Sequence, residues 1–349
     1  MTSERLYNFI RACTAVLIAF PAAFLIIALC SADPLHSIRV FMLSPFSQVR
    51  YIGNIVELAI PLVFSGLAMS VLFKASLFNL GGEGVFYISG LLISPIAIFI
   101  PMPSAIHQIA IILAGSIAGC IVMLIPGFLK AKYNASELVT SLMLNSILLG
   151  IGTYMLRHYI RDPATGTLMS YRFEPTALLP RIIPGTRIHL GLVIALICVA
   201  AMHVFMHKTK WGYEIRMTGV NKKFAIYSGM NTFKVVIMTH VIAGVLAGMG
   251  GAVQVIGMHR RFEWASLPGY GFDGALIAML GNNNPLGVAG AAVFVAYLRV
   301  GAEMVARLSD VPAEMISILQ AIILLLVSAK RFLNWHRLKR QEIEVTGDA

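Results

Sequence analysis

The stretch Phe78-Asn79-Leu80-Gly81-Gly82-Glu83-Gly84, called the first break below, places an amide, a carboxylate and three glycines between two long apolar segments. The hydrocarbon core of a bilayer offers no water to backbone N–H and C=O groups. A polar, glycine-rich interruption therefore persists there only where protein buries it or where it lines a cavity. The first break predicts a membrane protein with a candidate permeation site at residues 78–84.

Composition agrees with a membrane location. Of the 349 residues, 58% are apolar and 12% are charged, and the mean hydropathy is +0.80, which lies outside the range of ordinary soluble domains. Apolar runs such as 12–30 and 188–206 approach the roughly 20 residues that a helix needs to cross the bilayer. The net charge of +11 comes from basic residues scattered through short connections, without a nucleic-acid-binding motif. An all-α polytopic bundle without a nucleic-acid partner is predicted.

Apolar runs separated by charge or by Pro and Gly clusters predict about ten membrane segments: 12–30, 53–73, 84–101, 105–126, 137–156, 188–206, 233–257, 270–281, 285–304 and 311–329. With both termini in the cytoplasm, every lysine falls on the cytoplasmic side, as the positive-inside bias requires. The predicted organisation is a cytoplasmic N-terminus over 1–11, a transmembrane domain over 12–329 and a basic cytoplasmic tail over 330–349. A cleaved signal peptide is the alternative for the first run.

Three connections between the predicted spans are unusual. The outer stretch 31–52 is too polar to cross the membrane and is predicted to form short amphipathic pieces along the surface. The outer loop 157–187 contains five arginines and is either a docking surface or a floppy loop. The inner loop 207–232 interleaves basic and aromatic residues at helical spacing. It is either a short surface helix that offers an apolar face to a partner or a passive basic loop held by anionic headgroups.

Two further patterns concern packing and symmetry. Gly115 with Gly119, and Gly244 with Gly248, are small residues four apart, which predicts close approach of helix backbones. A second break, Pro268-Gly269-Tyr270-Gly271-Phe272-Asp273-Gly274, precedes a short apolar run and repeats the order of carboxylate, glycine and apolar residues seen after Glu83. Paired interruptions in two halves of a membrane protein indicate a transport site between internal repeats.

Four motifs together resemble the permease subunits of bacterial ABC importers for nucleosides and simple sugars, a family related to branched-chain amino acid and ribose permeases. The motifs are the first break, Glu137 to Asn145 (E-L-V-T-S-L-M-L-N), Gly219 to Gly229 (G-V-N-K-K-F-A-I-Y-S-G), and the second break followed by Pro285-Leu286-Gly287. They occur in the family's order between about residues 50 and 330. In one place the chain departs from the family pattern: Lys223-Phe224-Ala225 stands where relatives usually carry an acidic residue and two alanines.

The resemblance implies a type II-like ABC importer permease fold of about ten helices in the bacterial inner membrane. It also implies a second permease subunit, identical or different, a cytoplasmic ATPase that binds ATP and Mg, and a periplasmic or lipoprotein solute-binding protein. The chain has no G-x-x-x-x-G-K-[ST] motif, so the ATP must be hydrolysed by that partner. The expected solute is a nucleoside, a simple sugar or riboflavin. A non-ABC secondary transporter or channel, and an intramembrane transferase, are the alternatives from other classes.

Two sets of residues are candidates for function. The translocation candidates are Phe78, Asn79, Glu83, Asn145, Tyr270, Phe272 and Asp273, and the ATPase-coupling candidates are Glu214, Arg216, Gly219, Asn221, Lys222, Lys223, Tyr227 and Gly229. For Glu83 and Asp273, the alternative to solute contact is that each carboxylate caps the start of the helix that follows it. For the aromatic residues, the alternative to stacking on a solute ring is ordinary aromatic packing.

Two side-chain pairs at helical spacing are predicted to be structural. Arg299 and Glu303 lie four residues apart, which predicts an internal ion pair. His203 and His207 have the same spacing, but no third ligand accompanies them, so a metal site is not predicted.

Overall fold

The computed structural model describes residues 33–311, together with Phe24 and Ser31. Two of the predicted spans, 12–30 and 311–329, and both terminal segments lie almost wholly outside this range. The predicted location of the two termini therefore stays a prediction. The described residues are mainly helical, with two isolated β-bridges and no longer strand. They divide into two compact units, one that includes residues 33–52 with 297–311 and one of residues 53–296.

The smaller unit contains the short helical pieces predicted for the stretch 31–52. These are α2 (Pro34–Leu43) and η1 (Ser44–Phe46). Asp33 begins α2 because its carboxylate accepts a hydrogen bond from the backbone N–H of His36 at 3.2 Å. The hydroxyl of Tyr297 donates to the carbonyl of Met42 at 3.1 Å, and its ring stacks on Phe46 with 5.4 Å between centroids.

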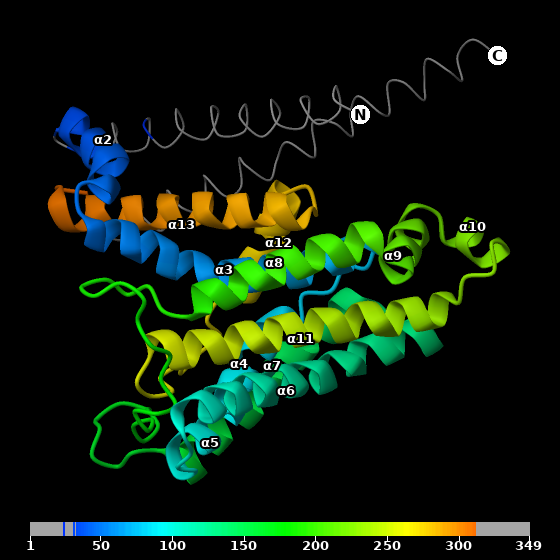
Figure 1. The fold of residues 1–349 in the computed structure, drawn as a ribbon, viewed down its shortest axis with the longest axis horizontal. Helices are drawn as coiled ribbons and strands as arrows, with labels where there is room; N and C mark the ends of the chain where they lie inside the picture. Colours follow the sequence, from blue (N-terminus) through cyan, green and yellow to red (C-terminus); the bar gives the residue numbers. More distant parts are fainter. Residues whose placement is uncertain (1–23, 25–30, 32, 312–349) are drawn as a thin grey trace. The chain divides into compact units, whose positions relative to one another are not determined.

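The larger unit is a bundle of long apolar helices with short ones at its ends (Figure 1). The elements are α3 (Val49–Lys74), α4 (Gly82–Leu92), α5 (Ser94–Phe99), α6 (Ser104–Tyr133), α7 (Glu137–Met155), η2 (Leu156–Ile160), α8 (Gly191–Lys208), α9 (Lys210–Val220), α10 (Lys222–Tyr227), α11 (Thr232–Met258), α12 (Tyr270–Leu280) and α13 (Pro285–Leu308); α3 and α13 continue into the smaller unit. Among the described residues, seven helical segments are long and apolar enough to cross a membrane, and α12 is a shorter apolar helix. Each of the eight spans predicted between residues 53 and 304 coincides with one of these segments.

The span predicted at 84–101 corresponds to α4 and α5, which are separated at Ile93 and together form one candidate membrane span, Gly82–Phe99. The predicted end of the span 105–126 is wrong, because α6 continues through Pro126 to Tyr133. Membrane helices tolerate an internal proline because neighbouring groups satisfy the carbonyl that it leaves without a donor.

The predicted glycine contacts are confirmed, and the two pairs contact each other. A Cβ atom added to Gly119 would lie 2.8 Å from the Cα of Gly248, and one added to Gly115 would lie 3.0 Å from the carbonyl oxygen of Gly248. Helices α6 and α11 therefore touch backbone to backbone, the arrangement that small residues permit in membranes.

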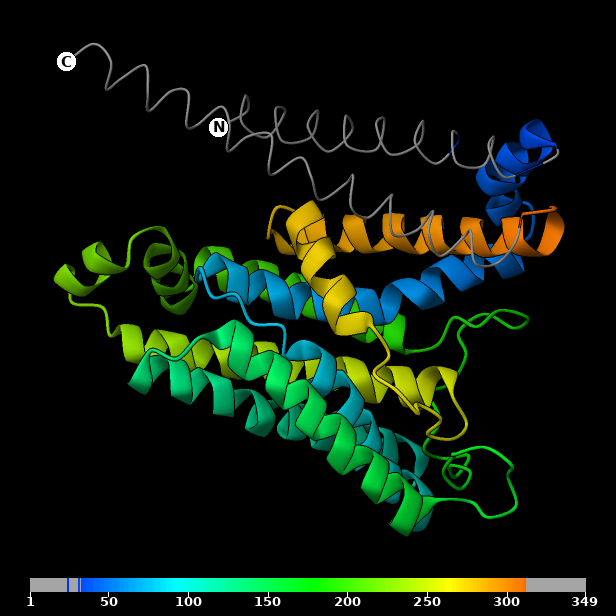
Figure 2. The ribbon, with the colours of Figure 1, turned by 180° about the vertical axis from the view of Figure 1, so that it is seen from behind.

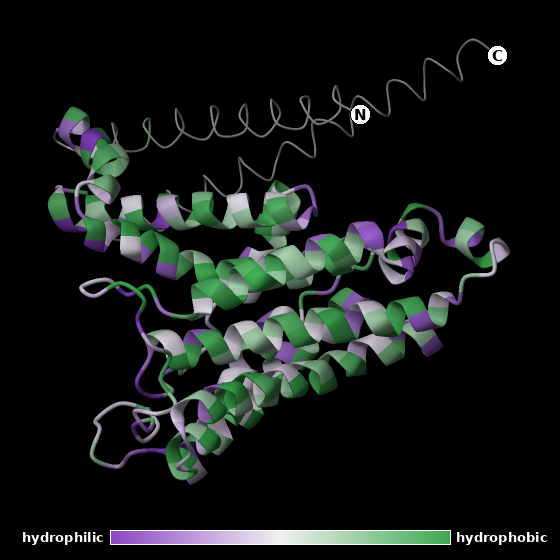
Figure 3. Ribbon diagram, viewed as in Figure 1, coloured by the Kyte–Doolittle hydropathy of each residue, from purple (hydrophilic) through white to green (hydrophobic). Residues whose placement is uncertain are grey.

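Helices α6, α7 and α8 present apolar side chains outward. On α6 the exposed residues include Ile109, Leu113, Ile117 and Ile121, which recur every four residues along one face. Figure 3 shows apolar residues along the helices, with hydrophilic residues gathered at α9, α10 and the loop 157–187. An apolar face of this length is stable in lipid and would aggregate in water. The described helices are therefore those of a multi-pass membrane protein.

The loop 157–187 is folded onto the loop that follows α11, and both lie at the opposite end of the larger unit from α9 and α10 (Figure 1). The backbone N–H of Ser170 donates to the carbonyl of Phe262 at 3.0 Å, and the Ser170 hydroxyl accepts from the N–H of Phe262 at 2.9 Å. The guanidinium of Arg261 lies 2.7 Å from the carboxylate of Asp162. The alternative of a floppy loop is therefore wrong, because contacts far away in sequence hold its backbone in place.

His189 ends this loop with a buried ring. Its Nδ1 atom accepts a hydrogen bond from the N–H of Gly191 at 3.1 Å, and the ring occupies space that a side chain at Gly257 would fill. Burial, and secondarily the charge of Arg181, lower the pKa of His189 from 6.5 to about 4. The folded protein therefore holds this imidazole neutral at physiological pH.

The titration of His189 predicts that stability falls in acid. Because the folded pKa is below the unfolded value, the stabilising contribution is fully present above pH 6.5 and is lost as the pH falls from 6.5 towards 4, for a total of about 3 kcal/mol. We expect the Tm of detergent-purified protein to fall more between pH 7 and pH 5 than the Tm of His189→Gln, whose amide oxygen still accepts from Gly191. Equal falls in the two proteins would contradict this prediction.

Candidate functional site

The first break is held by the side chains of α7. Asn145 accepts a hydrogen bond from the N–H of Gly84 at 2.9 Å and donates one to the carbonyl of Leu80 at 3.0 Å. One turn earlier, the Ser141 hydroxyl accepts from the N–H of Leu80 at 3.1 Å. The irregular backbone is thus satisfied by side chains, as a low-dielectric environment requires. Asn145, a translocation candidate from the sequence, is here a residue that holds the break.

Glu83 joins the first break to the second. Its side chain is fully buried, and its carboxylate accepts hydrogen bonds from the N–H groups of Gly269 at 2.5 Å, Gly271 at 2.6 Å and Phe272 at 3.3 Å. These donors lie at the start of α12, where the first N–H groups of a helix lack intrahelical partners and the helix dipole attracts an anion. We call this set of four residues the carboxylate clamp.

The clamp corrects the predicted capping role of Glu83. The residue does lie in the first turn of α4, but its carboxylate caps the start of α12, almost 190 residues later in the chain. Figure 2 shows α12 as a short inclined helix in the larger unit. A Cβ atom at Gly271 would overlap the backbone of Glu83, so the close approach of the two breaks requires glycine at that position.

The remaining polar candidates are buried near the two breaks. Asn79 is fully buried, and its side-chain oxygen accepts from the N–H of Gly81 at 2.7 Å. Its Nδ2 atom has no hydrogen-bond partner among the described residues, and the same is true of the Oε1 atom of Gln254 on α11. Asp273 is 8% exposed and lies in the first turn of α12. The breaks therefore contribute several polar groups to an otherwise apolar core.

The aromatic candidates differ in their surroundings. Phe78 is 42% exposed and stacks on Phe73 with centroids 5.3 Å apart, so aromatic packing accounts for part of its position. Phe272 is 41% exposed. Tyr270 lies 6.3 Å from the ring of Trp264, and its hydroxyl accepts from Gln254 at 3.3 Å.

Sequence reasoning missed Trp264 at the site. Its ring belongs to a row of neighbouring aromatic side chains that begins and ends on α4 and passes through the loop after α11 and the second break. The row is made of Tyr87, Phe262, Trp264, Tyr270 and Phe86. The sequence does contain a signal for it: Phe262 and Trp264 are aromatic residues two apart in a polar loop, shortly before the glycine-rich second break.

The predicted coupling loop forms two short helices instead of one. Helix α9 ends at Val220, and Asn221 begins α10 by accepting from the N–H of Phe224 at 3.0 Å. Gly229 follows α10 with a positive φ of 78°, a conformation that favours glycine. Asn221 and Gly229 therefore determine where α10 begins and ends.

The other coupling candidates divide into exposed and packed residues. Lys222, Lys223 and Tyr227 are exposed on α10, and Tyr227 is 90% exposed. On α9, the Glu214 carboxylate lies 3.9 Å from the ammonium of Lys210, and the Nη1 atom of Arg216 is buried without a partner among the described residues. Gly219 packs against the backbone at the end of α3, and the hydroxyl of Ser76 donates to its carbonyl at 2.7 Å.

The two side-chain pairs at helical spacing lie on α13 and α8. The carboxylate of Glu303 lies 3.8 Å from the guanidinium of Arg307, one turn further along α13, and the ion pair of Glu303 with Arg299 stays a prediction. His207 bonds through Nδ1 to the carbonyl of His203 at 2.9 Å. In the part of the chain that the structure describes, no group of three His, Cys, Asp or Glu residues could hold a metal ion.

Comparison with known proteins gives matches over most of the chain. The family described as "Branched-chain amino acid transport system / permease component" matches residues 51–328. The "Glucose ABC transporter permease protein TsgB13" of Haloferax volcanii is 31% identical over 317 residues, covering 88% of this chain and 83% of that protein. The "Guanosine ABC transporter permease protein NupP" of Bacillus subtilis is 31% identical, covering 81% and 82%. The "Nucleoside ABC transporter permease protein NupB" of Lactococcus lactis is 28% identical, covering 90% and 89%.

Proposed function

The chain belongs to the family of branched-chain amino acid transport permease components, and from this membership we propose that it is the membrane subunit of an ATP-binding cassette importer for a nucleoside or a related small polar solute. The resemblance inferred from the four motifs is confirmed by the family match. The observation that carries the proposal is that match over residues 51–328, which includes both breaks. Transport by alternating access fits two interrupted segments that contact each other in a helical bundle.

The choice of solute follows the relatives. Two of the three compared relatives are named for guanosine or nucleosides and one for glucose. A nucleoside presents a flat ring and several hydroxyl groups, which suits the half-buried rings of Trp264 and Tyr270 in the aromatic row and the buried polar atoms of Asn79 and Gln254. A simple sugar is the second candidate, since it shares the hydroxyl groups and lacks the aromatic base. Riboflavin, the third solute expected from the sequence, also has a ring that the aromatic row suits.

Helices α9 and α10 are the proposed contact for a cytoplasmic ATPase. They lie at the end of the larger unit where Lys130, Lys132, Lys208 and Lys234 also lie, and the positive-inside rule assigns that end to the cytoplasm. The exposed α10 surface has a basic part and an aromatic part, as expected of a protein contact. The contact of Gly219 with α3 would transmit motion of α9 to the helix that precedes the first break.

The remaining partners follow from the same orientation. The loops 157–187 and 258–270 lie together at the opposite end and are the proposed docking surface for a periplasmic or lipoprotein solute-binding protein. A second permease subunit, identical or different, completes the path. The proposed location is the bacterial cytoplasmic membrane, and the chain itself serves transport without hydrolysing ATP.

The proposal predicts uptake that depends on α10. In cells that carry this chain with its ATPase and binding protein and lack other nucleoside uptake, we expect accumulation of radiolabelled guanosine. The double variant Lys222→Glu, Lys223→Glu should reduce uptake by up to about tenfold, since a loss of about 1.4 kcal/mol at the ATPase contact raises its Kd tenfold, and should reduce recovery of the ATPase by pull-down.

Lys208→Glu is the matched control because it reverses a charge at the same end but outside α10. Wild-type uptake and pull-down in the double variant would refute the coupling role. Uptake of glucose without guanosine would shift the solute to a sugar, and absence of both with intact assembly would refute the solute class.

A further inference from the structure

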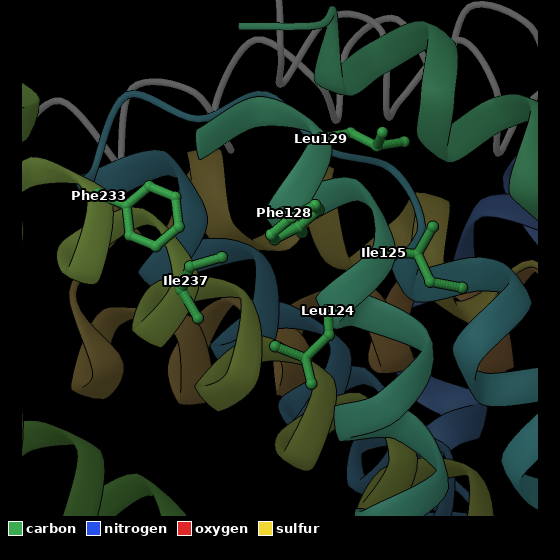
Figure 4. Close-up of a pocket in the computed structure, with 6 residues that line it drawn as sticks. All are labelled: Leu124, Ile125, Phe128, Leu129, Phe233 and Ile237. Atoms are coloured by element: carbon green, nitrogen blue, oxygen red, sulfur yellow. The ribbon is translucent and has the colours of Figure 1, made fainter. Parts of the chain in front are cut away.

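An apolar groove lies on the outer surface between α6 and α11, at their lysine-rich ends (Figure 4). It has a volume of about 550 Å³ and is lined by Leu124, Ile125, Phe128 and Leu129 of α6 and by Phe233 and Ile237 of α11. Every lining side chain is aliphatic or aromatic. Ile125, Phe128 and Phe233 are between 43% and 49% exposed, so the groove opens outward from the bundle. It is separate from the two breaks.

Cations and an aromatic hydroxyl surround the end of this groove. The ammonium of Lys132 lies 5.4 Å from the ring centroid of Phe128, which lines the groove, and 5.3 Å from that of Tyr133. Lys234 follows the lining residue Phe233 and is exposed. Among the described residues, no acidic side chain pairs with Lys132 or Lys234, whereas the nearby Lys130 is neutralised by Glu137 at 3.0 Å.

We propose that the groove binds one anionic phospholipid, with an acyl chain along the α6 and α11 residues and the phosphate headgroup at Lys132 and Lys234. Charge complementarity argues for this occupant: an apolar wall that ends in two unpaired cations matches a molecule with an apolar chain and an anionic end. Tyr133, 63% exposed beside Lys132, is of the type enriched at the level of lipid headgroups. A protein helix in the groove would have to bring acidic residues to the same two lysines.

The site has a consequence for the bundle. The groove residues of α6 lie one to three turns beyond Gly119, and those of α11 lie two to three turns before Gly244, so the lipid would bridge the two helices beyond the end of their glycine contact. Binding to the folded protein alone stabilises it by mass action. The proposal does not depend on the identity of the transported solute.

The test is a lipid-dependent melting experiment on the full chain in detergent. Added dioleoylphosphatidylglycerol is expected to raise the Tm by about 3 °C or more above the value with dioleoylphosphatidylcholine. The difference should disappear in the variant Lys132→Gln, Lys234→Gln and shrink in Ile237→Trp, which fills the groove. It should persist in Lys208→Gln, a lysine at the same end on α8, and in Ile117→Trp, an exposed α6 residue outside the groove.

Two results would overturn the proposal. An equal response to both lipids, or the same loss in Lys208→Gln, would show that no specific headgroup contact exists. A halved particle mass for Ile237→Trp in light scattering would assign the groove to a second copy of the chain.

Discussion

Replacing Glu83 with glutamine is expected to lower the Tm of the purified protein by about 6 to 12 °C and to remove solute uptake. Three hydrogen bonds to a charged group contribute about 1.5 to 3 kcal/mol each, or roughly 5 to 9 kcal/mol together. Neutralising the side chain recovers about 3 kcal/mol of the cost of holding a charge in the membrane, and one hydrogen bond to the amide oxygen remains. With about 1 kcal/mol for the remaining bond, the net loss is about 1 to 5 kcal/mol. Its middle value, about 3 kcal/mol, corresponds to about 6 to 12 °C at about 2 to 4 °C per kcal/mol.

The physical reason is the geometry of the carboxylate clamp. Two carboxylate oxygens accept from Gly269, Gly271 and Phe272, whereas a glutamine has one acceptor and turns an NH₂ group towards N–H donors. Because the start of α12 is held by this contact, its loss separates the two breaks. Thermal melting and membrane abundance measure the structural part, and uptake measures the functional part.

Glu303→Gln is the matched control, because its ion pair with Arg307 is exposed and exposed pairs contribute about 0 to 1 kcal/mol. Its Tm should stay within about 4 °C of wild type. If Glu83→Gln melts like wild type but takes up solute with altered affinity, Glu83 contacts the solute instead of holding α12, and the interpretation of the clamp is wrong.

The first break illustrates how far sequence reasoning reached. The pattern predicted a buried polar interruption, a paired second break and a carboxylate at a helix start, and the structure contains all three. It did not reveal that Glu83 caps α12, because a carboxylate beside glycines is compatible with any nearby helix start, and only the three-dimensional fold brings residue 269 to it. The same limit applies to Asn145, whose partners Leu80 and Gly84 lie more than 60 residues earlier.

Features that depend only on a local stretch of sequence were predicted more accurately than those that depend on tertiary contacts. Hydrophobic length predicted the eight described spans, since the bilayer imposes the same requirement on every helix. The order of the outer loop was not predictable, because its arginines and prolines indicate polarity, whereas its hydrogen bonds to Arg260, Phe262 and Ile256 depend on where α11 ends. The end of α6 at Tyr133, beyond the predicted end of its span at residue 126, likewise depends on neighbouring helices that one segment of sequence does not show.

The contact between α6 and α11 gives the other large expected effect. Gly119→Ala is expected to lower the Tm and the membrane abundance of the chain, because its Cβ would lie 2.8 Å from the Cα and 3.0 Å from the N of Gly248. The Cα and N atoms of Gly248 belong to the backbone, so no side chain can move aside, and the helices must separate along their whole contact. Overpacking of this kind costs about 1 to 3 kcal/mol, which is roughly 2 to 12 °C in Tm.

Gly150→Ala is the matched control, and it is expected to have the opposite sign. Gly150 also lies inside a membrane helix, α7, but a Cβ there meets nothing within 4 Å. Alanine in a helix interior is about 0.5 to 1 kcal/mol more favourable than glycine, so Tm should rise slightly. Helix propensity alone predicts the same rise in Tm for Gly119→Ala. Only the backbone contact between α6 and α11 turns the expected change into a fall. Two rises, measured by melting in one detergent, would show that α6 and α11 are not in backbone contact; a fall at Gly119 with a rise at Gly150 isolates that contact as the cause.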